Sequence, residues 1–205
     1  MSMRQHMTTS AAERPDFAAI AAWIPNGASV LDLGCGDGSL LRYLKETRAV
    51  RGYGVEISDL DIVSCIVNGM NVIQNDLESG LSDFEDNSFD FVILSQTLQA
   101  TRHTEALIRE MLRVGREGIV SFPNFGYWKN RFRVLLGNMP VSRELPYQWY
   151  DTPNVHLCTL RDFENFCREK SVAVLQRSVM TGEREVSLLP NLLGSTAVYR
   201  FQRAT

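Results

Sequence analysis

The sequence predicts an α/β protein built on a doubly wound, mostly parallel sheet of seven strands, with an antiparallel strand at one edge. From residue 29 onward, short apolar runs alternate with segments of helical periodicity, the pattern of successive strand and helix units. The run at 89–94 is almost wholly apolar, as in a central parallel strand covered on both faces. A turn with three glycines follows the first strand, where such folds bind ligands.

The N-terminal half supplies the parallel part of this expected sheet. An amphipathic helix at 16–24 ends at the Pro-Asn-Gly turn 25–27, and five strand and helix units follow. Strands are expected at 29–33, 51–56, 71–75, 89–94 and 118–122, with helices at 40–46, 59–68 and 103–114.

The C-terminal region departs from this alternation. A helix at 159–170 begins with the capping-box pattern Thr159-x-x-Asp162, and two strands are expected at 172–181 and 195–203. The connection 182–194 is long for a crossover without a clear helix, so we expect an antiparallel pair that closes one edge of the sheet.

Length and composition indicate an ordinary globular protein, which we interpret as a single domain over 1–205. The formal charge of -3 disfavours general nucleic-acid binding, because no positive field opposes a phosphate backbone. No stretch approaches the ~18 apolar residues that cross a membrane, and no signal sequence is visible, so we expect a cytoplasmic protein. The four cysteines form no C-x-x-C pair, and no metal site is predicted.

The turn after the first strand carries acids on both sides of its glycines. Gly34, Gly36 and Gly38 lack the spacing of a nicotinamide fingerprint, and Asp32 and Asp37 would repel a diphosphate. A ligand with positive groups fits better, such as S-adenosylmethionine with its sulfonium and ammonium. Glycines would let the backbone approach such a ligand closely. The alternative is a tight turn that binds nothing.

Groups complementary to the same ligand follow the next three strands. Glu56 ends the second strand, where an acid accepts hydrogen bonds from both ribose hydroxyls. Asp76 ends the third and could accept from an adenine amine, while Leu77 offers an apolar edge to the ring. Ser95 lies where the fourth strand ends and where the donor's reactive end would meet an acceptor. Alone, Glu56 could be a surface acid and Asp76 a turn residue.

Taken in order, these residues resemble the class I S-adenosylmethionine-dependent methyltransferase superfamily over about residues 28–125. The D-x-G-x-G-x-G segment that begins at Asp32, the ribose acid Glu56 and the adenine acid Asp76 carry the resemblance. It implies a Rossmann-like fold and S-adenosylmethionine or S-adenosylhomocysteine as the cofactor.

Nearly the whole chain also resembles the MetW family of methionine-biosynthesis proteins. The segments that carry this resemblance are 95–103, 111–116, 119–125, 145–154 and 156–159. The resemblance implies a bacterial protein that supports homoserine O-acyltransferase, its expected partner. It implies no established methyl acceptor, so an active methyltransferase on a small molecule or protein remains the alternative function.

An aromatic-rich insertion at about 124–156, here called the aromatic segment, exceeds what the scaffold needs. Of nineteen aromatic residues, eight fall between Phe122 and Tyr150, and a helix is expected around 125–133. The segment could be a lid over an acceptor, a partner surface, or the apolar underside of a long excursion. The residues expected at a partner surface are Phe125, Tyr127, Trp128, Trp149 and Tyr150.

The catalytic group, if methyl transfer needs one, is not assigned by the sequence. His103 and His156 are the candidates by titration range, but a surface or structural role fits each of them better. Ser95-Gln96-Thr97 replaces the N-P-P-Y-type segment expected after the fourth strand in amide- and base-methylating members, which counts against those substrates.

Overall fold

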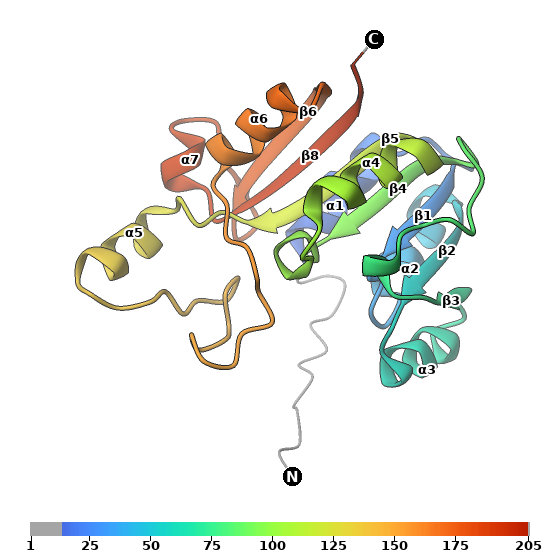
Figure 1. The fold of residues 1–205 in the computed structure, drawn as a ribbon, viewed down its shortest axis with the longest axis horizontal. Coiled ribbons are helices and arrows are strands. Elements are labelled where there is room, and N and C mark those ends of the chain that lie inside the picture. Colours follow the sequence, from blue (N-terminus) through green and yellow to red (C-terminus); the bar gives the residue numbers. More distant parts are fainter. Residues whose placement is uncertain (1–13, 205) are drawn as a thin grey trace.

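The computed structural model describes residues 14–204, and its centre is an eight-stranded sheet of order β3-β2-β1-β4-β5-β8-β6-β7 (Figure 1). Five neighbouring strands are parallel: β1 (Ser29–Leu33), β2 (Arg51–Glu56), β3 (Val72–Gln74), β4 (Phe89–Ser95) and β5 (Gly115–Pro123). Because β1 pairs with β2 on one side and with β4 on the other, the strand order reverses there, and the predicted doubly wound sheet is confirmed.

The C-terminal strands run against the parallel ones. β8 (Thr196–Arg203) pairs antiparallel with both β5 and β6 (Val172–Thr181), so the expected antiparallel pair is present, with β8 inside the sheet. The expected count of seven strands is one too low. The connection after β6 forms the strand β7 (Arg184–Glu185) and the short helix α7 (Pro190–Leu193), both too short to give a periodic pattern in the sequence.

Helices cover both faces of the sheet. Helices α1 (Pro15–Trp23), α2 (Ser39–Arg48) and α3 (Asp59–Val67) lie on one face, and α4 (Thr104–Val114) and α6 (Leu160–Glu169) lie on the other. In β1, Val30 packs with the first group while Leu31 and Leu33 pack with the second. Residues 14–204 contain no helix with the length and apolar content that a bilayer span requires.

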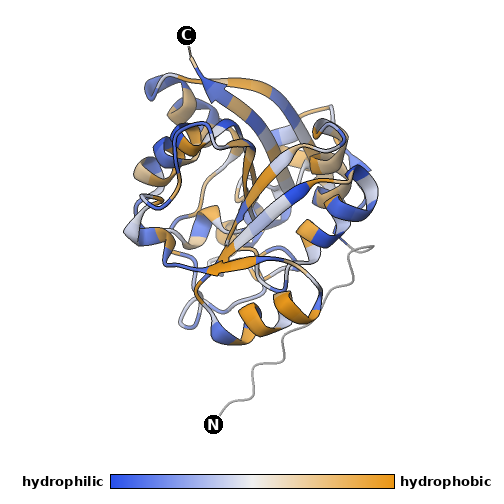
Figure 2. Cartoon of the chain, turned by 90° about the vertical axis from the view of Figure 1, so that its right-hand side faces the viewer, coloured by the Kyte–Doolittle hydropathy of each residue, from blue (hydrophilic) through white to orange (hydrophobic). Residues whose placement is uncertain are grey.

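Helix α3 has an apolar outer surface, seen at the bottom of Figure 2. Leu60 and Val67 are 78% and 81% exposed, and Cys65 is the buried residue of the helix.

The aromatic segment leaves the sheet after β5 and forms the helix α5 (Trp128–Leu135), followed by irregular chain (left in Figure 1). Phe125 and Tyr127 precede this helix, so the expected start was too early. The two ends of the segment are joined, because Phe125 N donates to Cys158 O at 3.0 Å.

Asn124 fixes the start of the aromatic segment. This fully buried side chain donates to the carbonyl oxygens of Asn191 and Gly194, at 3.2 and 2.8 Å, and accepts from Gly126 N at 2.9 Å. It therefore ties the end of β5 to the α7 region.

Candidate functional site

Asp32 lies in β1 beside the glycine turn and is 2% exposed. Its Oδ1 is buried without a hydrogen-bond partner among the described residues. The pKa of this carboxyl is raised from 3.8 to about 7, chiefly by burial and also by Glu56 and Asp16, while Arg14 opposes the shift. A buried carboxyl oxygen without a donor is suited to a ligand that brings a positive N–H group.

The three glycines of the turn have left-handed backbone conformations but different surroundings. At Gly34 a Cβ atom would lie 2.8 Å from Thr97 Cγ2, and at Gly38 it would lie 2.7 Å from Cys65 Sγ. Packing within the protein therefore requires these two glycines. Gly36 has φ +55°, and no atom lies within 4 Å of the position its Cβ would take. Of the three, Gly36 is the one that leaves space for a ligand.

Glu56 is held against this turn by backbone amides. Its Oε2 accepts from Gly36 N at 2.9 Å, and its Oε1 accepts from Ile57 N at 2.8 Å and Ser58 N at 3.0 Å. Because a carboxylate has about four acceptor positions, it can also accept from a ligand hydroxyl. The structure thus brings Asp32, Gly36 and Glu56 together at the carboxyl ends of β1 and β2.

Asp76 and Leu77 follow β3 but are partly engaged elsewhere. Asp76 is exposed, and its Oδ1 accepts from Glu78 N at 2.9 Å to cap the 3-10 helix η2 (Leu77–Ser79). Leu77 is half-buried and packs against the core. The other oxygen of Asp76 is the group available to an adenine amine.

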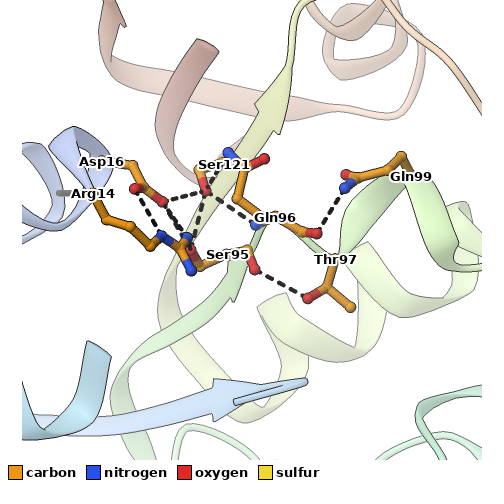
Figure 3. A network of polar contacts seen from close by, with 7 residues as sticks. All are labelled: Arg14, Asp16, Ser95, Gln96, Thr97, Gln99 and Ser121. Carbon is orange, nitrogen blue, oxygen red and sulfur yellow. Dashed lines mark hydrogen bonds and ion pairs between the residues drawn. The ribbon is translucent and has the colours of Figure 1, made fainter. Parts of the chain in front are cut away.

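Ser95 belongs to a polar network that sequence reasoning missed (Figure 3). Its Oγ accepts from Arg14 Nη2 at 2.8 Å and donates to Asp16 Oδ2 at 3.0 Å. Asp16 is 3% exposed and also accepts from Ser121 Oγ at 3.1 Å and from Arg14 Nη2 at 2.6 Å. The only sequence signal was an acid at the start of a helix, which ordinary helix capping explains.

A cavity of about 440 Å³ adjoins this network. Arg14, Asp16 and Gln96 line it, together with residues 143, 144, 146 and 147 of the aromatic segment. None of the residues that line it belongs to the glycine turn, where Gly34 packs against the side chain of Thr97.

The two histidines are exposed and do not line this cavity. His103 is the N-cap residue of α4, and its Nδ1 lies 2.6 Å from Glu78 Oε2. His156 is exposed, and its Nε2 lies 3.3 Å from Arg102 O. Neither residue lines the cavity.

The aromatic side chains expected at a partner surface differ in exposure. Trp128, Trp149 and Tyr150 are 45%, 72% and 70% exposed. Tyr127 is 7% exposed and Phe125 is half-buried, so these two contribute to packing.

Solved structures with a similar fold are class I methyltransferases and a relative with another chemistry. An S-adenosylmethionine-dependent methyltransferase from Mesorhizobium loti superposes with a TM-score of 0.70 at 17% identity, over 94% of this chain and all of that one. The [4+2]-cyclase SpnF superposes with a TM-score of 0.65 at 16% identity, over 93% and 80% of the two chains. Likeness at this identity shows the fold, and SpnF illustrates that the fold does not fix the reaction.

The sequence comparisons are more specific. Residues 14–201 match the family model described as methionine biosynthesis protein MetW. The bifunctional methionine biosynthesis protein MetXA/MetW of Rhodopirellula baltica is 38% identical over 202 residues, which are 92% of this chain. The chain spans 32% of that relative's length. With its methyltransferase-like fold, the chain belongs to the MetW family of methionine biosynthesis proteins.

Proposed function

We propose that this protein binds S-adenosylmethionine or S-adenosylhomocysteine at the carboxyl ends of β1 to β3 and supports homoserine O-acyltransferase in bacterial methionine biosynthesis. The observation that carries the cofactor assignment is the arrangement of Gly36 and Glu56. Space is open over Gly36, and the Glu56 carboxylate is fixed beside it by three backbone amides. A nucleoside ribose needs such an oriented acceptor next to a backbone it can approach.

The charges around this space favour a cationic nucleoside over a dinucleotide. Asp32 places an unpartnered carboxyl oxygen near the turn, where the ligand's ammonium would supply the missing donor. Beyond Glu56, the exposed side chain of Ile57 offers an apolar surface, and Asp76 offers an acceptor for the adenine amine.

The partner assignment rests on the relative in which MetXA and MetW are parts of one protein. By family resemblance, MetX is the homoserine O-acyltransferase, and fusion of two activities in one chain favours their association. The exposed Trp149 and Tyr150 pack edge to face, with ring centroids 5.7 Å apart, and offer the side-chain types that dominate interaction hot spots. We propose that they contact the acyltransferase, in the bacterial cytoplasm.

Cofactor binding is tested by calorimetric titration with S-adenosylhomocysteine. Gly36→Ala should weaken binding at least tenfold, because the new methyl group enters the space over the turn. Gly27→Ala is the matched control, since Gly27 also has a left-handed φ, +77°, with nothing within 4 Å, but lies in the turn before β1. Absence of binding by the unmodified protein, or equal affinity of both variants, would reject the assignment.

The partner surface is tested by co-purification with homoserine O-acyltransferase and by that enzyme's activity. Trp149→Ala combined with Tyr150→Ala should abolish both the association and the activation. Leu60→Ala is the control, because it removes an equally exposed apolar side chain from α3, at the other end of the sheet (Figure 1). Unchanged association of the double variant would exclude these side chains from the interface.

The cavity lined by Arg14, Asp16 and Gln96 favours a second candidate function, methyl transfer to a small molecule or protein. It lies next to the end of β4, where the reactive end of a bound donor would point. Transfer of labelled methyl groups in a cell extract should then require the unmodified protein and fail with Gly36→Ala. Equal labelling with both proteins would argue against catalysis.

A further inference from the structure

The cavity beside β4 is built from three separate parts of the chain. They are the start of α1, the turn after β4 with the 3-10 helix η3 (Leu98–Ala100), and the aromatic segment. Its volume of about 440 Å³ lies within the range of small-molecule sites. The residues that decide its chemistry are Arg14, Asp16, Gln96, Gln99, Glu144 and Tyr147.

One wall of the cavity carries a fixed guanidinium. Asp16 accepts from Arg14 Nε and Nη2, at 3.2 and 2.6 Å, and from the hydroxyls of Ser95 and Ser121. Four donors therefore saturate this buried carboxylate, whose task is to hold Arg14 in place. Arg14 Nη1 makes no hydrogen bond within residues 14–204, and Arg143 adds positive charge to the same cavity. This wall suits a carboxylate.

Another wall carries an acceptor that lacks a donor. Gln99 Nε2 donates to Gln96 O at 2.7 Å, and because a carbonyl oxygen can only accept, this bond fixes which end of the amide is the oxygen. Gln99 Oε1 is then buried without a partner among the described residues. A buried acceptor left in this state is costly, so a ligand that donates an N–H group would gain from filling it.

A carboxylate also lines the cavity. Glu144 accepts from Ser195 Oγ at 3.0 Å and from Ser142 Oγ at 3.1 Å, which fixes its carboxylate in the cavity wall. Two neutral hydroxyl donors leave its charge uncompensated by these contacts. A positively charged group in the cavity would find both this carboxylate and the amide oxygen of Gln99.

We propose that this cavity binds a small molecule that carries both an ammonium and a carboxylate group, of which a free α-amino acid is the simplest example. The guanidinium of Arg14 receives the carboxylate, and Gln99 Oε1 receives the ammonium. The lining of this cavity includes no residue of the glycine turn and not Glu56, so it is a site beside the proposed nucleoside site.

The test is calorimetric titration with the common free L-amino acids, with and without S-adenosylhomocysteine. At least one amino acid should bind, and its N-acetyl and methyl ester derivatives, which each lose one charge, should bind at least tenfold more weakly. The proposal would be overturned if no amino acid bound, or if both derivatives bound as tightly as the free amino acid.

Variants locate the binding. Gln99→Leu keeps the side-chain size and removes both the orphaned oxygen and the hydrogen bond to Gln96 O. It should lose at least tenfold in affinity, as should Arg14→Lys, and circular dichroism checks that both variants remain folded. Gln148→Leu is the control, because it alters an exposed amide of the aromatic segment that does not line the cavity. Gly36→Ala should retain amino-acid binding even if cofactor binding is lost. Loss in Gly36→Ala with full binding in Gln99→Leu would place the amino acid at the nucleoside site and overturn the proposal.

Discussion

Replacing Asp32 by Asn should change how the stability of the protein depends on pH. The carboxyl is 2% exposed, and burial raises its pKa from 3.8 to about 7. In this range the folded protein retains a proton that the unfolded chain has released. The unfolded state thus binds fewer protons, so the free energy of unfolding must fall as pH rises. The Asn side chain has the same shape and does not titrate.

The magnitude follows from the shift. The pKa rises by about three units, and each unit corresponds to about 1.4 kcal/mol, so the ionised carboxyl lowers the free energy of unfolding by about 4 kcal/mol above pH 8. Between about pH 5 and pH 8 the change is about 2.5 kcal/mol, because part of the loss already occurs between the two pKa values below pH 5.

Urea unfolding of the unmodified protein and of Asp32→Asn, at several pH values over this range, measures the difference directly. As pH rises from about 5 to 8, the free energy of unfolding of the variant should increase by about 2.5 kcal/mol relative to that of the unmodified protein. Glu105→Gln is a control, since a side-chain hydrogen bond from Lys170 lowers the pKa of Glu105, and the stability difference between this variant and the unmodified protein should not change over this pH range. If the free energy of unfolding of Asp32→Asn and of the unmodified protein changed with pH in the same way, the reasoning that burial raises the pKa of Asp32 would be refuted.

Three further predictions concern binding and packing. If the ligand's ammonium contacts Asp32, affinity for S-adenosylhomocysteine should rise up to about tenfold per unit as pH approaches 7 and level off above it, with proton release seen by calorimetry in two buffers. Gly34→Ala should destabilise by about 2–3 kcal/mol in thermal unfolding, because a strained backbone is added to a contact with Thr97, whereas Gly36→Ala should cost about 1 kcal/mol from backbone strain alone. Asn124→Ala should lower the free energy of unfolding by about 2–4 kcal/mol in urea, since three buried hydrogen bonds are lost, and a smaller loss would show that water replaces them.

Local sequence patterns were enough to predict the parallel strands and the residues at their ends. The segments 29–33 and 51–56 coincide with β1 and β2, because each is a short segment of strand-forming residues between turn and helix signals. Chain order alone then places Asp32 and Glu56 at one edge of the sheet.

Contacts between distant segments could not be predicted in this way. Asp16 and Ser121 are hydrogen-bonded across 105 positions, and nothing near either residue signals the other. The sequence also does not reveal which glycines of the turn are required by packing and which one leaves space. That difference depends on Thr97 and Cys65, which contact the turn from a loop and from α3. Such roles follow from tertiary packing, which a linear pattern does not encode.

The two ends of the aromatic segment are held close together, so the length of chain between them can change. Phe125 and Cys158 are joined by a backbone hydrogen bond, and the buried Asn124 fixes the start, so the two attachment points keep their positions whatever the length between them. Changes in loop length inside such a closed excursion cost little. The segment can therefore tolerate changes in its length while β5 and α6 stay in place.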